Sequence, residues 1–568
     1  MQDDWKVTRR LTINPGIRFQ HISPTWSQGD IQNNWVPSLF PALSALNPLI
    51  KPGCTITPAA GSGCPTADRV GINPITGAQV SPGLIGDYAP NASGVVAGAI
   101  YPGAKAFPVS TPAINQPSLG LGPRIGFAYD VFGDGKTAVR GGFGMFNDRP
   151  VGDDIFNGLL TQPPNFLTYQ ASDTTVSAIQ ALCCSTSNLY LSPLGLQAYQ
   201  VNWHLPQSYD WSLGVQQDIG GGFLLDVAYA GNVARHLLMN SNINAVNYGT
   251  LIPGNSNFNC SAYDPSAGVG TTCANTSTNT PLITGAYADI LRPYPNDGAI
   301  SYHTFDGNSN YNSLQTQLQR RFNKSLTLTG TWTWSKVLDF GLGGFGGNSW
   351  APYVPRRAQY GPASGYRKHN FVLNWTYNVP RASQKWNNLL VRETLDGWQV
   401  AGLYTLTAGG PTTISYNISG NSNPTGAIAG DGLVTAVSLN PLCTGHSMKH
   451  LDASCILAPP VAASANPNVA FSGLGNASLK DVFNGSWTNN WNISLFKHFA
   501  LGKSETRSLE LRMETYNTFN HTQFTSYNTS ANFTQAGSTI TSSFAQNFLQ
   551  HTAAAAPRTM QAAIRLLF

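Results

Sequence analysis

The sequence predicts an all-β protein, an antiparallel transmembrane β-barrel, and three observations carry that prediction. Charged residues make up only 10% of the chain and aromatic residues 11%, whereas soluble domains carry roughly 25% charged residues. The chain lacks the apolar run of ~18 residues that a membrane-spanning helix needs. Apolar residues instead alternate with polar ones in many segments, which is typical of strands with one apolar face.

The first predicted strand covers residues 5–19, where one face carries Leu11, Ile13, Ile17 and Phe19. Pro15 removes one backbone donor from this strand, so we expect either a bulge or a sheet edge there. A long region rich in Pro, Gly, Ser and Asn follows. Residues 122–132 and 136–146 then predict a hairpin, because only Gly133, Asp134 and Gly135 separate two alternating segments.

The middle of the chain repeats this arrangement. Residues 208–219 and 223–232 meet at the turn Gly220–Gly222, and residues 311–322 and 325–337 meet at Asn323 and Lys324. The clearest alternation sets one apolar face against a threonine face, with Leu326, Leu328, Trp332 and Trp334 opposite Thr327, Thr329, Thr331 and Thr333. These segments predict two further hairpins.

Five strands are predicted in the last third of the chain, at residues 369–380, 395–407, 490–499, 507–517 and 557–568. Charged residues alternate with apolar ones in the fourth, at Glu510, Arg512 and Glu514, and we expect them to face a wet lumen rather than lipid. The last strand ends on Phe568. An exposed terminal aromatic leaves an adherent edge in a soluble protein, so we interpret Phe568 as an assembly signal for the barrel-assembly machinery.

The predicted connections alternate between long and short without exception. Long outer loops and short periplasmic turns are typical of bacterial outer-membrane barrels. The chain would supply about twelve strands of such a barrel. Both chain ends then fall on the periplasmic side. A soluble propeller or repeat sandwich is the alternative fold, but its strands are shorter and its surface carries more charge.

Six of the eight cysteines form near pairs within loop-like sequence. We predict three disulfides in an oxidising compartment, namely Cys54–Cys64, Cys260–Cys273 and Cys443–Cys455. Cys443, His446, His450 and Cys455 also have a spacing that suits zinc, but an exported loop favours the disulfide with two bystander histidines. Cys183 and Cys184 are adjacent and remain unassigned.

Other candidate sites have simpler interpretations. The string GDGKT, from Gly133 to Thr137, resembles the end of a phosphate-binding loop, but Asp130 stands where that motif needs glycine and no helix follows. Asp3, Asp4 and His21 are expected to be solvated rim residues. The glycine-rich stretch near Gly341 is predicted to be a loop.

Catalysis is not expected, because no nucleophile and base or paired carboxylates have usable spacing, and no cofactor or metal is expected either. The net charge of +5 is spread along the chain, which does not favour nucleic acid as a partner. Five tryptophans can stack on a sugar, but an interfacial girdle or lipid-facing position is more typical of barrels; they are Trp332, Trp334, Trp375, Trp398 and Trp491.

An ordered set of segments carries a family resemblance. QDDWKVTRRLTINPGIRF, GPRIGFAYDVFGDGKTAVRGGFGMF, LDVAYAGN, YNSLQTQLQRRF, LTGTWTWSK and PRTMQAAIRLLF resemble the barrel of TonB-dependent outer-membrane receptors, most of all the Oar-like branch of Gram-negative soil bacteria. The resemblance implies a 22-stranded barrel with an N-terminal plug and a TonB box. Plug, signal peptide and early strands have no counterpart here, so residues 1–568 are expected to be one domain, the C-terminal portion of such a barrel.

The resemblance also implies a location and a function. The protein is expected to be a multi-pass β-barrel of the Gram-negative outer membrane, surrounded by lipid, that takes up or exports an unidentified substrate such as an oligosaccharide or a metal chelate. The TonB complex would act only through the missing plug, so the chain is not expected to transport by itself. A passive pore or a loop-displaying adhesion protein is the alternative.

Overall fold

The computed structural model describes most of the predicted strands and part of the connections. The described residues are 3–22, 34–37, 40, 48–57, 64–89, 117, 119–149, 158–162, 190, 192–202, 204–245, 292–323, 325–341, 348–349, 354, 356–386, 388–419, 437–440, 452–458, 475–501, 508–536 and 539–567.

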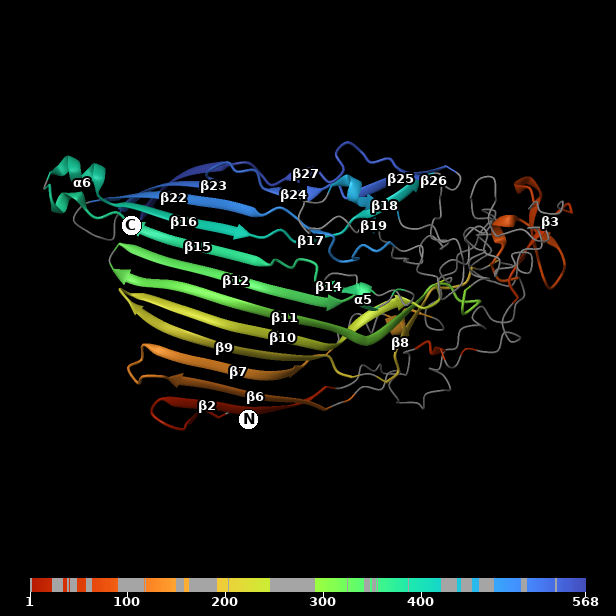
Figure 1. Ribbon diagram of the computed structural model, residues 1–568, viewed down its shortest axis with the longest axis horizontal. Helices are drawn as coiled ribbons and strands as arrows, with labels where there is room; N and C mark the ends of the chain where they lie inside the picture. The colour runs from red at the N-terminus through yellow and green to blue at the C-terminus, as the bar shows by residue number, and fades with distance from the viewer. Residues whose placement is uncertain are drawn as a thin grey trace.

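One antiparallel sheet dominates the structure (Figure 1). Each long strand pairs with the next long strand along the chain, and all twelve predicted strands lie in this path. In order, the path runs through β1 (Trp5–Lys6), β2 (Leu11–His21), β6 (Leu119–Asp130), β7 (Thr137–Asn147), β9 (Gln207–Gly220), β10 (Phe223–Asn242), β11 (Ile300–Asn323), β12 (Leu326–Phe340), β15 (His369–Asn378), β16 (Trp398–Thr407), β22 (Thr488–Ala500), β23 (Ser508–Tyr516) and β28 (Thr559–Leu567).

The register separates an apolar face from a polar face across the whole sheet. Residues paired across antiparallel strands project to the same side, and the pairs Trp332 with Phe371 and Tyr404 with Trp491 place large aromatics on one side. The same face leaves apolar side chains exposed, including Ile125 at 53%, Leu213 at 53% and Ile564 at 75%. So wide an apolar surface is found on proteins that contact lipid.

The opposite face is polar, as the alternation predicts. Thr329 of β12 pairs with Asn374 of β15, and Glu510 of β23 pairs with Arg565 of β28. Arg512 bridges Glu510 at 3.2 Å and Glu514 at 3.6 Å on this face. Charged side chains on this face are expected to contact a water-filled lumen rather than the hydrocarbon of the bilayer.

Two predicted details are settled by the pairing. Pro15 keeps an unbroken register with Ile125, so no bulge forms at this proline. Its strand, β2, is instead nearly an edge, since beyond it only the short β1 pairs. At the other side of the sheet β28 pairs with β23 alone, and within the described residues β28 does not meet β1 or β2.

The sequence predicts that every connection at one end of the sheet is short. This prediction is wrong for one connection, the one between β15 and β16. The β6–β7 and β9–β10 connections are tight, whereas residues 379–397 between β15 and β16 contain η7 (Ala382–Gln384) and α6 (Leu389–Leu395). Asn388 caps α6, since its side-chain oxygen accepts the Leu390 N–H at 2.9 Å. This cap and its helix do not follow the alternation of period two that predicts strands.

The strands β10 and β11 are longer than predicted, because the polar run from Ile300 to Asn310 continues the ladder. The short strands β8 (Leu196–Tyr199) and β13 (Asn348–Ser349) pair with β11 and β10 in this extension. The strand β14 (Tyr360–Pro362), which follows α5 (Arg356–Gln359), pairs with β12. A hydrophobic cluster of Trp35, Leu196, Ala198 and Ile300 packs beside it. We call the end of the sheet with long connections the outer end, as in bacterial barrels.

The remaining elements are short and lie in the long connections. They are β3 (Lys51–Cys54), η3 (Thr66–Asp68), β4 (Arg69–Ile72), β5 (Gln79–Val80), η4 (Pro82–Leu84), β17 (Pro411–Thr412), β18 (Ser415–Ser419), β19 (Ser438–Leu439), η8 (Ala453–Cys455), β20 (Ile456–Leu457), β21 (Phe483–Asn484), β24 (Phe524–Tyr527), β25 (Ser530–Ala536), β26 (Thr539–Ser542) and β27 (His551–Ala554). No helix in the described part of the chain is long and apolar enough to span a membrane.

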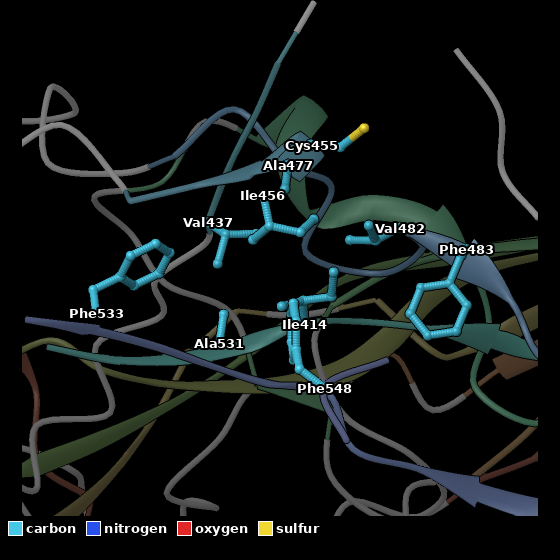
Figure 2. Packing of buried hydrophobic residues seen from close by; sticks show 10 residues of the cluster. All are labelled: Ile414, Val437, Cys455, Ile456, Ala477, Val482, Phe483, Ala531, Phe533 and Phe548. Atoms are coloured by element: carbon cyan, nitrogen blue, oxygen red, sulfur yellow. The ribbon is translucent and has the colours of Figure 1, made fainter. Parts of the chain in front are cut away.

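The connections after β16 and β23 share a hydrophobic core of their own. Figure 2 shows ten buried residues that come from both connections, among them Ile414, Val437, Phe483, Phe533 and Phe548. The parallel pairing of β18 with β25 joins the two connections through their backbones. The connections after β16 and β23 therefore pack against each other and share one core, rather than folding as separate loops.

Candidate ligand site at the outer end of the sheet

A cavity of about 630 Å³ lies at the outer end, where β10 and β11 leave their regular register. Nine described residues line it, and most are polar or charged: Arg235, His236, Phe305, Asp306, Gly307, Asn308, Arg356, Arg357 and Tyr360. The first two come from β10, the next four from β11 and the last three from α5 and β14. Three parts of the chain therefore meet at this cavity, which has the size of a small-molecule site.

The backbone bends at the cavity because the β10–β11 ladder is irregular there. The register shifts on both sides of Leu237, and His236 takes the left-handed conformation with φ of 57°. Gly307 pairs with Leu237, and a Cβ at residue 307 would lie 2.8 Å from the Leu237 carbonyl oxygen. Such local strain persists where the surrounding structure fixes it, and it is frequent at binding sites.

The cavity is rich in cationic side chains. Arg356 is fixed in place, since its guanidinium donates to the Asp306 carbonyl oxygen at 2.9 Å and to Asn308 Oδ1 at 2.8 Å, and it lies over the Phe340 ring at 4.0 Å. The side chains of Arg235 and Arg357 are exposed. Asp306 is the acidic residue of the lining, which also contains three arginines and one histidine.

This arrangement suits a ligand with anionic groups. An arginine guanidinium presents planar paired donors that match carboxylate and phosphate oxygens. The His236 ring, which lines the cavity, stacks on the His204 ring, with ring centroids 4.8 Å apart. Sequence reading missed this site, although the doublets Arg235-His236 and Arg356-Arg357 stand out in a chain with so few charges.

The candidate sites named from the sequence lie elsewhere. Cys54 and Cys64 are joined by a disulfide with Cα atoms 5.8 Å apart, and Cys455 is disulfide-bonded. Several other candidates fall outside the described residues and keep the status of predictions: Cys183, Cys184, Cys260, Cys273, Cys443, His446, His450 and Phe568. Among the described residues no cluster of three His, Cys, Asp or Glu side chains is placed to hold a metal.

The string GDGKT is a hairpin turn, as predicted. Asp130 accepts hydrogen bonds from the Gly133 N–H at 2.8 Å and the Gly135 N–H at 3.0 Å. Its carboxylate therefore fills the position beside these amides that a phosphate would need.

The rim residues are not brought together. Asp3 and Asp4 lie beside the middle of β2, where the Asp3 N–H donates to Pro15 O. His21 is at the far end of that strand, about 20 Å beyond Pro15 at the usual rise of a strand, so these residues form no acid–base site with one another.

The five tryptophans singled out in the sequence all lie on the apolar face, as the strand registers show. Trp491 contacts Trp375 and Tyr404, with ring centroids 6.0 Å and 4.1 Å apart. Trp332 and Trp334 both stack near His369, at 6.1 Å and 6.4 Å. Their position agrees with lipid-facing aromatics rather than with a sugar site in the lumen.

Comparisons with known proteins bear on the family. No curated protein matches the chain significantly. Similar solved structures include the outer membrane transporter YddB from Escherichia coli (8% identity, TM-score 0.39, 79% of this chain and 41% of that one) and the siderophore receptor PirA from Acinetobacter baumannii (10%, 0.36, 79% and 41%). The ferric enterobactin receptor PfeA from Pseudomonas aeruginosa is a third (10%, 0.37, 79% and 40%).

The chain thus spans about two fifths of the length of these solved proteins. The family described as "Outer membrane beta barrel domain" matches residues 1–561, which is nearly the whole sequence. The strand alternation, the dominant antiparallel sheet and its apolar face agree with that match. The chain belongs to the outer membrane beta barrel domain family, and its place is the outer membrane.

Proposed function

We propose that this chain forms the wall of a TonB-dependent receptor that takes up a solute with anionic groups. The observation that carries the proposal is the basic cavity at the outer end, where Arg235, Arg356 and Arg357 converge. The polar face of the sheet supports a transport role, because a solute that leaves the cavity would meet side chains such as Thr329 and Asn374 rather than hydrocarbon. Dependence on TonB rests on the sequence resemblance.

The chemistry of the cavity narrows the substrate class. A metal chelate with carboxylate groups or an acidic oligosaccharide would pair its oxygens with the arginines, whereas a neutral sugar would leave these cations without such partners. A hydrogen bond to a charged group contributes about 1.5–3 kcal/mol. Loss of two such contacts would therefore weaken binding of the anionic solute by at least tenfold.

The test measures uptake by cells that carry the protein in their outer membrane. Residues 1–568 behind a secretion signal, and the same reading frame extended upstream, are expressed in hosts with and without TonB that lack their own ferric citrate receptor. Radiolabelled ferric citrate serves as the anionic probe and maltohexaose as the neutral one. We expect uptake of ferric citrate that requires TonB and falls at least tenfold in the double variant R235A/R357A.

The matched control is K136A, which removes one cation from the β6–β7 turn at the opposite end of the sheet and is expected to leave uptake unchanged. Uptake of both probes at equal rates without TonB would instead identify a passive pore. Equal uptake of ferric citrate by R235A/R357A and the unaltered protein would show that the cavity does not bind the transported solute.

A further inference from the structure

The connection between β15 and β16 has an unusual composition for a turn. Its residues 381–396, here called the turn-end segment, include η7 and α6, and they lie at the end of the sheet where the other connections are tight (Figure 1). Four large apolar side chains of this segment are exposed to solvent: Trp386 at 57%, Leu389 at 64%, Leu390 at 71% and Leu395 at 49%. Exposed apolar groups gathered in one short segment indicate a contact surface.

The turn-end segment is held in one position by its own hydrogen bonds. Asp396 accepts the Ser383 N–H at 3.0 Å and also the Ser383 hydroxyl. These bonds join η7 to the residue that follows α6. The hydroxyl bond is the main reason that the pKa of Asp396 lies below its usual value. The exposed side chains therefore stand on a folded support.

The side on which the segment lies follows from two residues of the sheet. Trp398 of β16 and Lys497 of β22 are paired in register, and both belong to the apolar face. The Trp398 indole donates to the Thr394 carbonyl oxygen at 2.8 Å, and Lys497 Nζ donates to the same oxygen at 3.3 Å. Because both side chains project from the apolar face, the last turn of α6 lies on the lipid side of the sheet.

Basic residues flank the exposed apolar group. Lys385 Nζ lies over the Trp386 ring, 5.2 Å from its centroid. Arg392 is exposed on α6 and pairs there with the neighbouring Glu393 at 3.2 Å, so its remaining guanidinium donors face solvent. Tryptophan beside lysine and arginine, with leucines next to them, is the composition of segments that rest at a membrane surface. The apolar rings and chains enter the acyl boundary, while the cations stay among the lipid phosphates.

We propose that the turn-end segment is a membrane-surface anchor, in which Trp386, Leu389 and Leu390 insert into the lipid leaflet at the short-turn end of the barrel. The partner is the phospholipid leaflet, and Lys385 and Arg392 contact its phosphate groups. The anchor is continuous with the apolar face through Trp398, so it widens the lipid contact of β15 and β16 at this edge. This inference does not depend on what the barrel transports.

The test places a spin label on the protein in vesicles of phosphatidylethanolamine and phosphatidylglycerol. The variant L390C supplies the labelling site, since the Leu390 side chain is 71% exposed and its replacement is expected to leave the fold intact. Lys136→Cys in the β6–β7 turn, whose side chain is 65% exposed, is the matched control at the same end of the sheet. We expect the ratio of oxygen to nickel-chelate accessibility to be several-fold higher at residue 390 than at residue 136.

Either of two results with the spin label would overturn the proposal. Equal nickel-chelate accessibility at both labels would place Leu390 in water. A label at residue 390 that is shielded from both reagents would indicate contact with protein, either a second copy or another partner. Should L390C fail to assemble, the difference in fluorescence quenching by brominated lipids between the unaltered protein and W386F gives a second measurement, and quenching that does not differ would also contradict insertion.

Discussion

The rings of Tyr404 and Trp491 stack with their centroids 4.1 Å apart and their planes 24° from parallel. The two residues face each other because β16 and β22 are neighbours in the sheet, although residues 408–487 separate the strands along the chain. This aromatic pair therefore packs β16 against β22 on the apolar face.

This stacking predicts a measurable coupling between the two rings. In a double-mutant cycle of Tyr404→Leu and Trp491→Leu, we expect an interaction free energy of about 1 kcal/mol beyond the loss of area, as for other aromatic pairs. Urea unfolding of the protein in lipid vesicles measures it. Trp211 of β9 and Trp491 lie on strands that share no neighbour, so the cycle Trp211→Leu with Trp491→Leu should be additive.

The β6–β7 turn offers a matched pair of glycine variants. Gly133 and Gly135 both have positive φ, at 79° and 73°, so alanine at either position costs about 1–2 kcal/mol of backbone strain. A Cβ at residue 133 would in addition lie 2.5 Å from Arg10 Nε, whereas residue 135 has open space. We expect G133A to lower the unfolding free energy more than G135A, and equal effects would show that Arg10 moves away freely.

The disulfide of Cys54 and Cys64 closes a loop of sequence separation 10. Its loss in C54S/C64S should destabilise this outer segment by about 2–3 kcal/mol, which appears as faster proteolysis between residues 48 and 89 and an unchanged stability of the sheet. Mass mapping without reductant also tests the predicted pairs Cys260–Cys273 and Cys443–Cys455. Free thiols with bound zinc at Cys443 and Cys455 would reverse the assignment of that loop.

The outer segment beside β11 should loosen as the pH rises. Burial raises the pKa of Asp297 from 3.8 to about 7, although the Trp35 indole, which donates to its carboxylate at 3.2 Å, opposes the shift. The folded state keeps a proton that the unfolded state loses, so the stability contributed by protonated Asp297 is full below pH 3.8 and is lost as pH rises to about 7.

Amide exchange of residues 292–300, corrected for the intrinsic effect of pH, measures this dependence. Protection should fall between pH 4 and pH 7, in the window between the two values for Asp297. Asp297→Asn keeps a neutral side chain that can accept the indole hydrogen bond, so its protection should stay constant across the window. A pH dependence that persists in D297N would assign the effect to another group.

Much of the sheet could be predicted because its signal is local. Side chains of a strand alternate between two faces, so the run from Leu326 to Trp334 reveals both its strand and its apolar face without reference to any other part of the chain. Tight turns are equally local, as Gly133 and Gly135 show. The observed strand order agrees with the prediction for all twelve strands.

Longer-range features escaped prediction. The polar run from Ile300 to Asn310 has the composition of a loop, yet it forms strand because β8 and β10 offer hydrogen-bond partners on either side. The helix α6 interrupts a connection that was expected to be short, and its position depends on Trp398 and Lys497 from two different strands.

The sequence by itself determined the fold class, the strands and the face that each side chain takes, since these follow from a period of two in the backbone. Only the tertiary structure decided which residues meet at the outer cavity. Arg235 and Arg356 are far apart in the chain, yet both line the cavity, because β11 pairs with β10 and Arg356 donates to Asp306 and Asn308 of β11. Pairing across long connections depends on the whole sheet, and no local pattern encodes it.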